Sequence, residues 1–523
     1  VAALVVMAGF VGSRALGLGR DIAISARFGT GHELDAYVAA FRVPDLVFNV
    51  LAGGALSSAL IPTLRAYLEH DEREAGWAMV RAVAAAVLGA LLVCAALAWL
   101  AAPALVRVLS PGWDAERLRL TASLVRLMLV TPILFGASGI ATAVLQAHQR
   151  FVMPAIAPAL YNAGIIAGAL LLAGPGGMGI VGLALGVVAG ALLHLGVQVP
   201  AVVRLGPLRG SIDLHHPGLR QVLLLMAPRL FGLAVVHLNF FVLTVLASFL
   251  PEGSLAALNF AWLLMMLPLG LFGMALSTAA LPALAAMAAR GELEALGAAL
   301  TRGLRVIILL SVPSAVGLIV LREPLVRILF ERGRFSEAST GMVATALVCY
   351  SAGLVAHAAL EMVTRGFYAL QDTRTPALVG AAALVLNIPL SLALMQPLRH
   401  SGLALGLSLA TMVETTVLYL WLRRRVPALR SGETIQALVY STGAALLMAL
   451  ALLAARPAAA RALTGAFVVR LGALLALIGA GALCYGLALW LFGVPEARAL
   501  PRMAAARMRP WLLRLWPSPS VQR

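Results

Sequence analysis

The sequence predicts an all-α integral membrane protein with about fourteen transmembrane helices. Composition is the first observation behind this prediction. The 523 residues are 62% hydrophobic and only 12% charged, with a mean hydropathy of +0.96, whereas soluble domains carry roughly 25% charged residues. The second observation is that long stretches lack Asp, Glu, Lys and Arg altogether, and residues 151–203 are long enough to cross a bilayer twice. Runs of this length suit helices and exceed the strands of a membrane barrel.

The apolar runs place the individual spans. Within residues 151–203, Gly174-Pro175-Gly176-Gly177 predicts a turn between two helices. The first run begins at Val1 and is interpreted as a span and not as a removed signal peptide, because no small-residue cleavage site follows it. In chain order, the predicted spans lie near residues 1–28, 34–66, 77–102, 118–146, 153–173, 178–203, 218–249, 254–287, 301–321, 337–369, 376–396, 401–422, 434–454 and 467–492.

The net charge of +17 depends on arginine alone, since the chain contains no lysine. The arginines gather in alternate loops and in the tail. This positive-inside bias predicts a bacterial plasma membrane protein with both termini in the cytoplasm, and it argues against nucleic acid as a partner. Exceptions fall on the predicted outer side, namely Arg107, Arg399, Arg456, Arg461 and the loop from Arg322 to Arg334.

The chain repeats itself at an offset of 220 residues. Residues 55–62 resemble residues 275–282, and Gly182-Leu183-Ala184-Leu185-Gly186 recurs at residues 402–406. The repeat predicts two parallel six-helix bundles, an arrangement of transporters that bind substrate between their halves. The predicted parts are an N-terminal bundle (residues 1–215), a C-terminal bundle (216–430), two additional transmembrane helices (431–495) and a basic cytoplasmic tail (496–523). Two interpretations of the tail stay open, a segment that lies on the membrane surface and a disordered one.

Charged residues cluster in the first two spans, whereas the equivalent part of the second half has few. Charge inside a span is costly and usually faces a cavity or a partner, so we favour a functional cavity over structural pairing. The planar fork of arginine suits phosphate oxygens. The cluster consists of Arg14, Arg20, Asp21, Asp35, Arg42 and Asp45.

Supporting candidates include Asp21 in this cluster and charges elsewhere. Arg229, near the start of the seventh span, either reaches the headgroups or faces the cavity. Glu361 and Arg365 are four residues apart on a helix and are expected to pair. Glu414 stands alone in its span and either binds a coupling ion or is a protonated or hydrogen-bonded acid. No spacing typical of a metal site, a nucleotide-binding loop or a catalytic motif occurs, so no cofactor, metal or enzymatic activity is expected.

A series of short motifs runs along nearly the whole chain. They are residues 13–21 (SRALGLGRD), 28–29 (FG), 35–36 (DA), 40–44 (AFRVP), 54–62 (GALSSALIP), 268–273 (PLGLFG), 329–335 (LFERGRF) and 367–376 (FYALQDTRTP). Together they resemble the signature of the MurJ/MviN family of lipid II flippases. The last two spans match that family's extra pair of helices, beyond a twelve-helix core shared with the multidrug/oligosaccharidyl-lipid/polysaccharide exporter superfamily.

The resemblance implies export of lipid II, the undecaprenyl-diphosphate-linked peptidoglycan precursor, from the inner to the outer leaflet for cell wall synthesis. It assigns the family's functional cations to Arg14 and Arg20, an acidic position to Asp35 and a basic position to Arg42. The expected partners are the lipid-linked diphosphate glycan, membrane lipids and proteins of peptidoglycan synthesis, and the expected state is a monomer.

Two departures from the family pattern remove cations. Phe48 lies in a second-span stretch that the family usually fills with arginine, and Leu263 stands where the eighth span usually carries one. The remaining arginines are therefore expected to do more of the binding, with Asp35 pairing with one of them in the empty cavity. Three alternatives stay open: a flippase for another lipid-linked oligosaccharide, a multidrug or cation antiporter of the same superfamily, or a membrane glycosyltransferase or ligase that uses a polyprenyl carrier.

Overall fold

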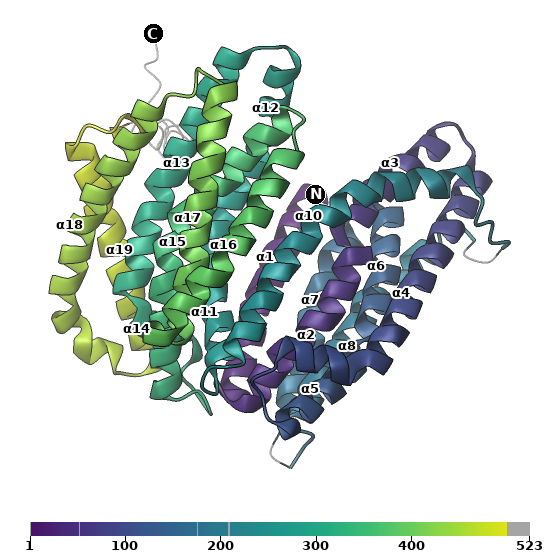
Figure 1. The fold of residues 1–523 in the computed structure, drawn as a ribbon, viewed down its shortest axis with the longest axis horizontal. Coiled ribbons are helices and arrows are strands. Elements are labelled where there is room, and N and C mark those ends of the chain that lie inside the picture. Colours follow the sequence, from purple (N-terminus) through teal and green to yellow (C-terminus); the bar gives the residue numbers. More distant parts are fainter. Residues whose placement is uncertain (1, 52, 175, 208–209, 499–523) are drawn as a thin grey trace, which may run out of the picture. The chain divides into compact units, whose positions relative to one another are not determined.

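The computed structural model describes residues 2–51, 53–174, 176–207 and 210–498, without the side chains of residues 2–8, 10, 11, 50, 51, 53–55 and 227–236. The predicted tail from residue 499 onward lies outside the described residues. The described chain is helical, with no strand among the assigned elements (Figure 1). The elements are α1 (Ala2–Phe28), α2 (His32–Leu51), α3 (Gly53–Glu69), α4 (Arg73–Leu109), α5 (Ala115–Met128), α6 (Val130–Ala147), α7 (Val152–Ala167), η1 (Gly168–Leu172), α8 (Ile180–Gly196), α9 (Val199–Val203), α10 (Pro217–Ala247), α11 (Ser254–Pro268), η2 (Leu269–Met274), α12 (Ala275–Ala289), α13 (Leu293–Val320), α14 (Arg322–Phe330), α15 (Glu337–Ala369), α16 (Arg374–Leu398), α17 (His400–Arg425), α18 (Ser431–Leu463) and α19 (Phe467–Leu491).

Helices occupy every predicted span, and the prediction of an all-α membrane protein is confirmed. Among the described residues, 11 helical segments are long and apolar enough to cross a membrane. The three other predicted spans, near residues 1–28, 34–66 and 218–249, contain residues whose side chains are not described. The count of fourteen crossings therefore stays a prediction.

The structure differs from the predicted boundaries in two ways. The segment from Arg322 to Arg334 was expected to be a loop but begins with the short helix α14. Because α14 contains charged residues, it does not stand out as an uncharged apolar run. In addition, α4 has 37 residues, a length of roughly 55 Å at 1.5 Å per residue, which exceeds the roughly 30 Å of hydrocarbon. Hydropathy marks only the part of such a helix that lipid surrounds, so its ends were missed.

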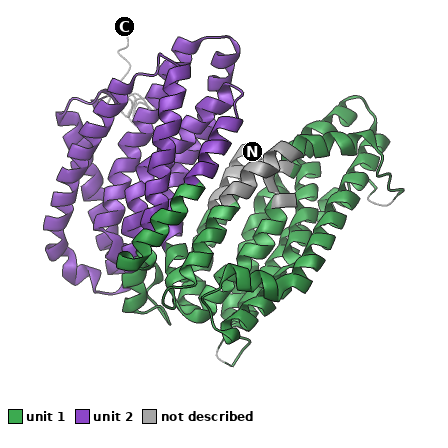
Figure 2. Ribbon diagram, viewed as in Figure 1, with its two compact units in different colours: residues 1–260, 329–343, 384–403 green, residues 261–328, 344–383, 404–523 purple. Residues whose placement is uncertain are grey.

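The described residues form two compact units (Figure 2). Unit 1 comprises residues 1–260, 329–343 and 384–403, and unit 2 comprises residues 261–328, 344–383 and 404–523. Several helices, such as α11 and α15, contribute one part to each unit. The division of the sequence at residues 215 and 430 rests on the repeat alone and stays a prediction.

Unit 1 is built on pairs of helices that are distant in sequence. α1 packs on α7, α2 on α5, α3 on α6, and α10 on both α2 and α3. Its core is apolar, with Leu56, Leu60 and Leu91 completely buried. Large apolar side chains also cover the outside, and Leu171 is 77% exposed. A soluble unit would bury such a side chain, whereas lipid solvates it at no cost.

Glycines let α7 and α8 approach closely. Gly164 and Gly168 on one side meet Gly182, Gly186 and Gly190 on the other, with the spacing of four residues that aligns them along one helix face. A Cβ atom built on Gly186 would lie 2.7 Å from the Cα of Gly168, closer than van der Waals contact. Since apolar burial adds little between helices in lipid, this close backbone packing is what holds the pair together.

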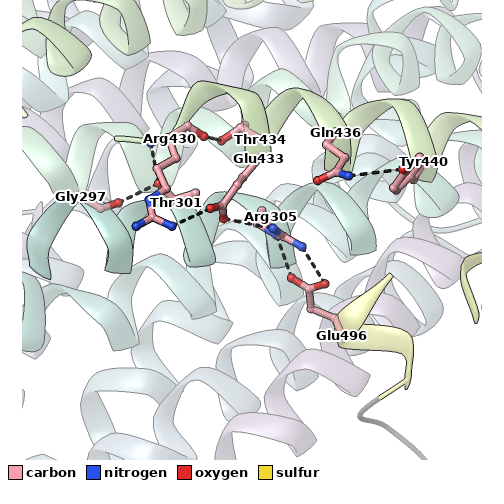
Figure 3. Close-up of polar contacts among 9 residues, drawn as sticks. All are labelled: Gly297, Thr301, Arg305, Arg430, Glu433, Thr434, Gln436, Tyr440 and Glu496. Carbon is pink, nitrogen blue, oxygen red and sulfur yellow. Dashed lines mark hydrogen bonds and ion pairs between the residues drawn. The ribbon is translucent and has the colours of Figure 1, made fainter. Parts of the chain in front are cut away.

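In unit 2, the last two helices are fastened to α13. Arg305 on α13 donates two hydrogen bonds to Glu496, at 2.9 and 3.0 Å, and one to Glu433 at 3.1 Å (Figure 3). Its side chain is only 14% exposed. Deeper in the unit, Tyr485 of α19 donates to the carbonyl of Leu309. These polar contacts supplement an apolar core shared by α13, α18 and α19.

The first prediction from the fold concerns the glycine contact. We expect Gly186→Val to lower the free energy of unfolding by about 1–3 kcal/mol, because the added side chain forces α7 and α8 apart. Thermal unfolding of the purified protein in detergent measures this effect. Gly196→Val is the control on the same helix, since nothing lies within 4 Å of a Cβ atom there. Equal stability of the two variants would contradict the close approach.

The second prediction concerns Arg305. We expect Arg305→Met to lower the free energy of unfolding by about 1–3 kcal/mol, because two partly buried carboxylates lose their charge-assisted hydrogen bonds. Arg290→Met is the control, since Arg290 pairs with Glu292 in an exposed loop, where solvent screening leaves an ion pair little effect on stability. An Arg305→Met protein that unfolds at the wild-type temperature would show that α18 and α19 do not depend on this contact.

Candidate functional site

A cavity of about 170 Å³ with both polar and apolar lining residues lies in unit 1. Its wall comes from α1, α2, α7 and the beginning of α11, and includes Arg20, Asp21, Tyr37, Arg42, Tyr161 and Asn259. Pockets for drug-sized ligands run to about 300–1,000 Å³. The cavity in this state can hold a small anionic group, but a lipid-linked glycan would require it to widen.

Arg20 is the cation held most firmly in the cavity wall. Its Nε and Nη2 atoms donate to the two carboxylate oxygens of Asp21 at 3.0 and 3.1 Å, and Nη1 donates to Oδ1 of Asn162 at 3.2 Å. Asn162 in turn donates to the carbonyls of Ser13 and Pro158, so its amide group is fixed from two sides. The guanidinium is thus oriented by α7 while its charge is balanced by a neighbour on α1.

Arg42 provides the second cation of the cavity wall. Its guanidinium carbon lies 4.9 Å from the centre of the Phe240 ring on α10, a cation–π contact. One turn later, Asp45 accepts a hydrogen bond from Asn49 and lies 3.8 Å from Nδ1 of His237. The polar side of α2 therefore packs along α10.

The turn between α1 and α2 contacts the turn between α10 and α11, which is its equivalent in the sequence repeat. The offset of 220 carries His32 onto Glu252, and these two residues are joined: the His32 amide donates to Oε1 of Glu252 at 2.7 Å. Partial burial works to raise the pKa of the Glu252 carboxyl, but hydrogen bonds from the amide and ring of His32 lower it below its usual value. Two equivalent turns of the sequence repeat therefore contact each other within unit 1.

Two further contacts in unit 1 follow the same relation. The Gly112 amide, after α4, donates to Oγ of Ser248 at the end of α10 at 3.1 Å. The Arg334 amide, after α14, donates to the carbonyl of Ala26 near the end of α1 at 2.8 Å. Adding 220 to the number of Gly112 gives a position two residues before Arg334. Subtracting 220 from the number of Ser248 gives a position two residues after Ala26. These contacts join positions that the sequence repeat makes equivalent, and the duplication itself stays a prediction from the sequence.

Asp35 breaks this symmetry, because its equivalent in the second half is Leu255. Its buried carboxylate accepts hydrogen bonds from the amides of Gly253 and Ala256, at 2.7 and 2.8 Å, in the first turn of α11. Arg117 of α5 lies 3.5 Å away. Asp35 thus caps a helix from another part of the chain, at the end that favours negative charge. In the described structure it pairs with Arg117, and Asp21 is the acid that pairs with Arg20.

The other candidate residues fall in different places. Arg14 is exposed on α1 and does not line the cavity. Arg229 lies in the part of α10 whose side chains are not described. In unit 2, Arg365 donates to Glu361 at 3.2 Å, so the predicted pair is confirmed. Phe48 packs against Phe135 with ring centres 5.7 Å apart.

Sequence reasoning missed the uncharged polar residues of the cavity. Tyr37, Tyr161 and Asn162 lie in spans and carry no formal charge, so a search for charges passed over them. The available signal was the pair Tyr161-Asn162, a strongly polar interruption in the charge-free stretch of residues 151–203. Polar side chains inside lipid need partners. Asn162 of this pair bonds Arg20 and Ser13 of α1, and Tyr161 lines the cavity.

Comparison with known proteins identifies similar sequences and folds. The family model described as "Lipid II flippase MurJ" matches residues 24–475. A protein of Burkholderia cenocepacia named "Lipid II flippase MurJ" is 32% identical over 458 residues, which are 86% of this chain and 88% of that one. A "Probable lipid II flippase MurJ" of Haemophilus influenzae is 31% identical over 428 residues, 78% and 83% of the two chains.

Two solved structures show the fold. "Lipid II flippase MurJ, inward closed conformation" aligns with a TM-score of 0.77 and 23% identity, and covers 94% of this chain and 98% of that one. An inward-facing multidrug resistance MATE family transporter of the MOP superfamily aligns with a TM-score of 0.67 and 18% identity, over 80% and 95% of the two chains.

The prediction from the site concerns the cap. We expect Asp35→Ala to lower the free energy of unfolding by about 1–3 kcal/mol, since it leaves two buried amides without an acceptor. Hydrogen exchange should accelerate at Gly253 and Ala256. Asp114→Ala is the control, because Asp114 caps the exposed start of its own helix, α5; it should lower stability less and leave those two amides protected. Unchanged exchange at both amides in Asp35→Ala would refute the cap.

Proposed function

Because this chain belongs to the lipid II flippase MurJ family, we propose that it moves lipid II from the inner to the outer leaflet of the bacterial plasma membrane for cell wall synthesis. Apart from sequence similarity, the observation that supports the proposal is the presence of two arginines in the wall of the cavity in unit 1. Arg20 and Arg42 face a space of about 170 Å³ inside a helical membrane protein. A charge in that position is expensive unless it serves a ligand.

Diphosphate is the part of lipid II that most resists transfer through hydrocarbon. It must exchange its hydration shell for donors supplied by the protein. A guanidinium donates parallel hydrogen bonds to neighbouring oxygens, and Tyr37, Tyr161 and Asn259 in the same wall carry further donors. The lipid-linked diphosphate is therefore the ligand group assigned to this cavity, with Arg14 and Arg229 as further cations along its path.

Asp21 serves as the counter-ion of the empty site. Its carboxylate occupies two of the Arg20 donors, and an arriving diphosphate would compete for them. Asn162 keeps the guanidinium oriented during this exchange, because it bonds the third nitrogen and is itself held by backbone carbonyls. Exchange of one anion for another avoids an uncompensated cation in the membrane interior at any stage.

The paired turns close one end of the cavity in this proposal. With both termini in the cytoplasm, the turns joined through His32, Asp35 and Glu252 lie on the outer side, so the outer side is shut in this state. Opening it requires loss of the Asp35 contacts to α11 and of the hydrogen bond between His32 and Glu252. Alternating access then needs no chemical step, and the protein acts as a transporter and not as an enzyme. A monomer with lipid II, membrane lipids and peptidoglycan synthesis proteins as partners fits this role.

A multidrug or cation antiporter is the second candidate, since the MATE fold is similar. A site for cationic drugs would favour an acidic wall, but Arg20 and Arg42 outnumber the single carboxylate of Asp21 in this one. The departures at Phe48 and Leu263 bear on which lipid-linked glycan is carried, and competition between lipid II and other lipid-linked diphosphates in a binding assay decides that point.

The prediction for function uses substitutions in a strain depleted of its own flippase. We expect Arg14→Ala and Arg20→Ala to reduce lipid II export to background, Arg14→Lys to weaken it by about tenfold, and Glu361→Gln to have a mild effect, because loss of a charge-assisted hydrogen bond costs about 1.5–3 kcal/mol. Export and membrane abundance are measured together, with Arg290→Ala as the control in an exposed loop. Abundant Arg20→Ala protein with full activity would overturn the assigned site, and failure of the unaltered chain to rescue the strain would overturn the function.

A further inference from the structure

Arg117 of α5 lies at the end of unit 1 where three turns meet, those between α1 and α2, between α4 and α5, and between α10 and α11. Its side chain is only 15% exposed. Its guanidinium carbon lies 5.1 Å from the centre of the Trp113 ring, so a cation–π contact holds the planar group from one side. The transport steps proposed above assign no role to Arg117.

Two donor atoms of this arginine are unused. Nε and Nη2 of Arg117 are buried, and neither donates a hydrogen bond to any of the described residues. Burying a charged donor without an acceptor is costly, and such atoms are rare in native structures. The carboxylate paired with the guanidinium is that of Asp35, whose Oδ2 lies 3.5 Å from Nη2. Charge-assisted contacts of this kind are usually about 2.7–2.9 Å long, so the ion pair is present without its hydrogen bonds.

The same two atoms form the carboxylate-binding edge of three other arginines in this chain. Their Nε and Nη2 atoms donate to the two oxygens of one carboxylate, at 2.6–3.1 Å, in the pairs Arg20–Asp21, Arg290–Glu292 and Arg305–Glu496. The planar fork of arginine matches a carboxylate in this orientation. In Arg117, the corresponding edge is buried and binds no carboxylate in this state.

Asp35 does not fill this edge because its carboxylate is held by α11. Oδ1 accepts a hydrogen bond from the amide of Ala256 at 2.8 Å, and Oδ2 accepts one from the amide of Gly253 at 2.7 Å. Asp35 therefore lies between two sets of donors, two backbone amides on one side and two nitrogens of Arg117 on the other. In the described structure, the amides hold the carboxylate.

The two sets of donors belong to helices that the proposed opening treats differently. Opening separates α11 from α2, whereas α2 and α5 pack against each other and can remain together. Asp35 would then be a buried carboxylate without its amide donors, which is costly inside a membrane protein. Shortening the contact to Arg117 from 3.5 Å to about 2.9 Å supplies two replacement hydrogen bonds. The carboxylate stays charged and paired throughout this exchange.

We propose that Arg117 is a positioning residue of the transport cycle, which takes over the carboxylate of Asp35 when α11 withdraws. The resulting two-point pair stabilises the state that is open to the outer side. The direction of opening rests on the proposed function, whereas the exchange of partners rests on the unused donors of Arg117 and their distance from Asp35. Arg117 acts on transport through Asp35.

Hydrogen exchange at the Gly253 and Ala256 amides, in the full chain in lipid bilayers, tests the exchange of partners, because these amides lose protection when α11 withdraws. We expect Arg117→Gln to slow exchange at both amides by about tenfold or more, since the open state loses hydrogen bonds between charged groups. Arg117→Lys should slow it less, because an ammonium restores the charge without the fork. Unchanged or faster exchange in Arg117→Gln would overturn the proposal, since removal of a mere brace of the closed turn increases opening.

Two further variants control this measurement. Arg119→Gln is the matched control, because Arg119 is exposed on the same helix, and exchange should stay at the wild-type rate. Asp35→Asn tests the identity of the partner, since a neutral amide cannot form the ion pair. Arg117→Gln should therefore cause no further slowing in the Asp35→Asn background. Equal slowing in both backgrounds would show that Arg117 acts through a group other than Asp35 and would overturn the proposed exchange.

The rate of lipid II flipping in vesicles tests the role of this exchange in transport. We expect Arg117→Gln to lower the rate by about tenfold at unchanged protein abundance, with Arg117→Lys between this variant and the wild type. A wild-type rate in Arg117→Gln would overturn the role of Arg117 in the cycle. Absence of flipping by the unaltered chain, with hydrogen exchange responding as expected, would refute the proposed function alone.

Discussion

Hydrocarbon offers no partner to a polar group, and the arrangement of this protein follows from that constraint. A buried charge or amide in lipid must find its partner inside the protein. Arg20 has Asp21 and Asn162, the open first turn of α11 has Asp35, and Arg305 has two carboxylates. Each pairing joins helices that are far apart in sequence or holds a charge beside a cavity. The polar residues therefore determine which helices become neighbours, a choice that apolar packing alone does not make.

The apolar surfaces alone would allow many arrangements, because leucine packs against lipid as favourably as against another helix. Close approach at small residues removes much of this freedom. The glycines of α7, η1 and α8 bring two backbones together along one face. In unit 2, the same purpose is served by the shared apolar core of α13, α18 and α19 with Tyr485 at its centre. Shape and polar pairing together select one set of neighbours.

Duplication explains the symmetric features, and departures from symmetry mark the functional ones. His32 and Glu252 occupy equivalent turns of the sequence repeat and contact each other within unit 1. Asp35 has no acidic counterpart in the second half, and the cationic cavity in unit 1 is built from α1, α2, α7 and α11. The two copies of the repeat thus share their helical frame but differ in their charges.

The sequence by itself determined the membrane class, the helices, the repeat and the family, because these depend on local composition, on runs of about 20 apolar residues and on motifs contiguous in the chain. It also singled out Arg20 and Arg42, since a charge inside a span is conspicuous, and the structure places both in the wall of one cavity. Only the tertiary structure decided which residues pair with them. Asn162 is 142 residues from Arg20, and Asp35 caps an amide 221 residues away. Such pairings depend on which helices become neighbours, and that choice is made by packing over the whole bundle. For the same reason, Arg117 was unremarkable in the chain and became a neighbour of Asp35 only when α5 met α2.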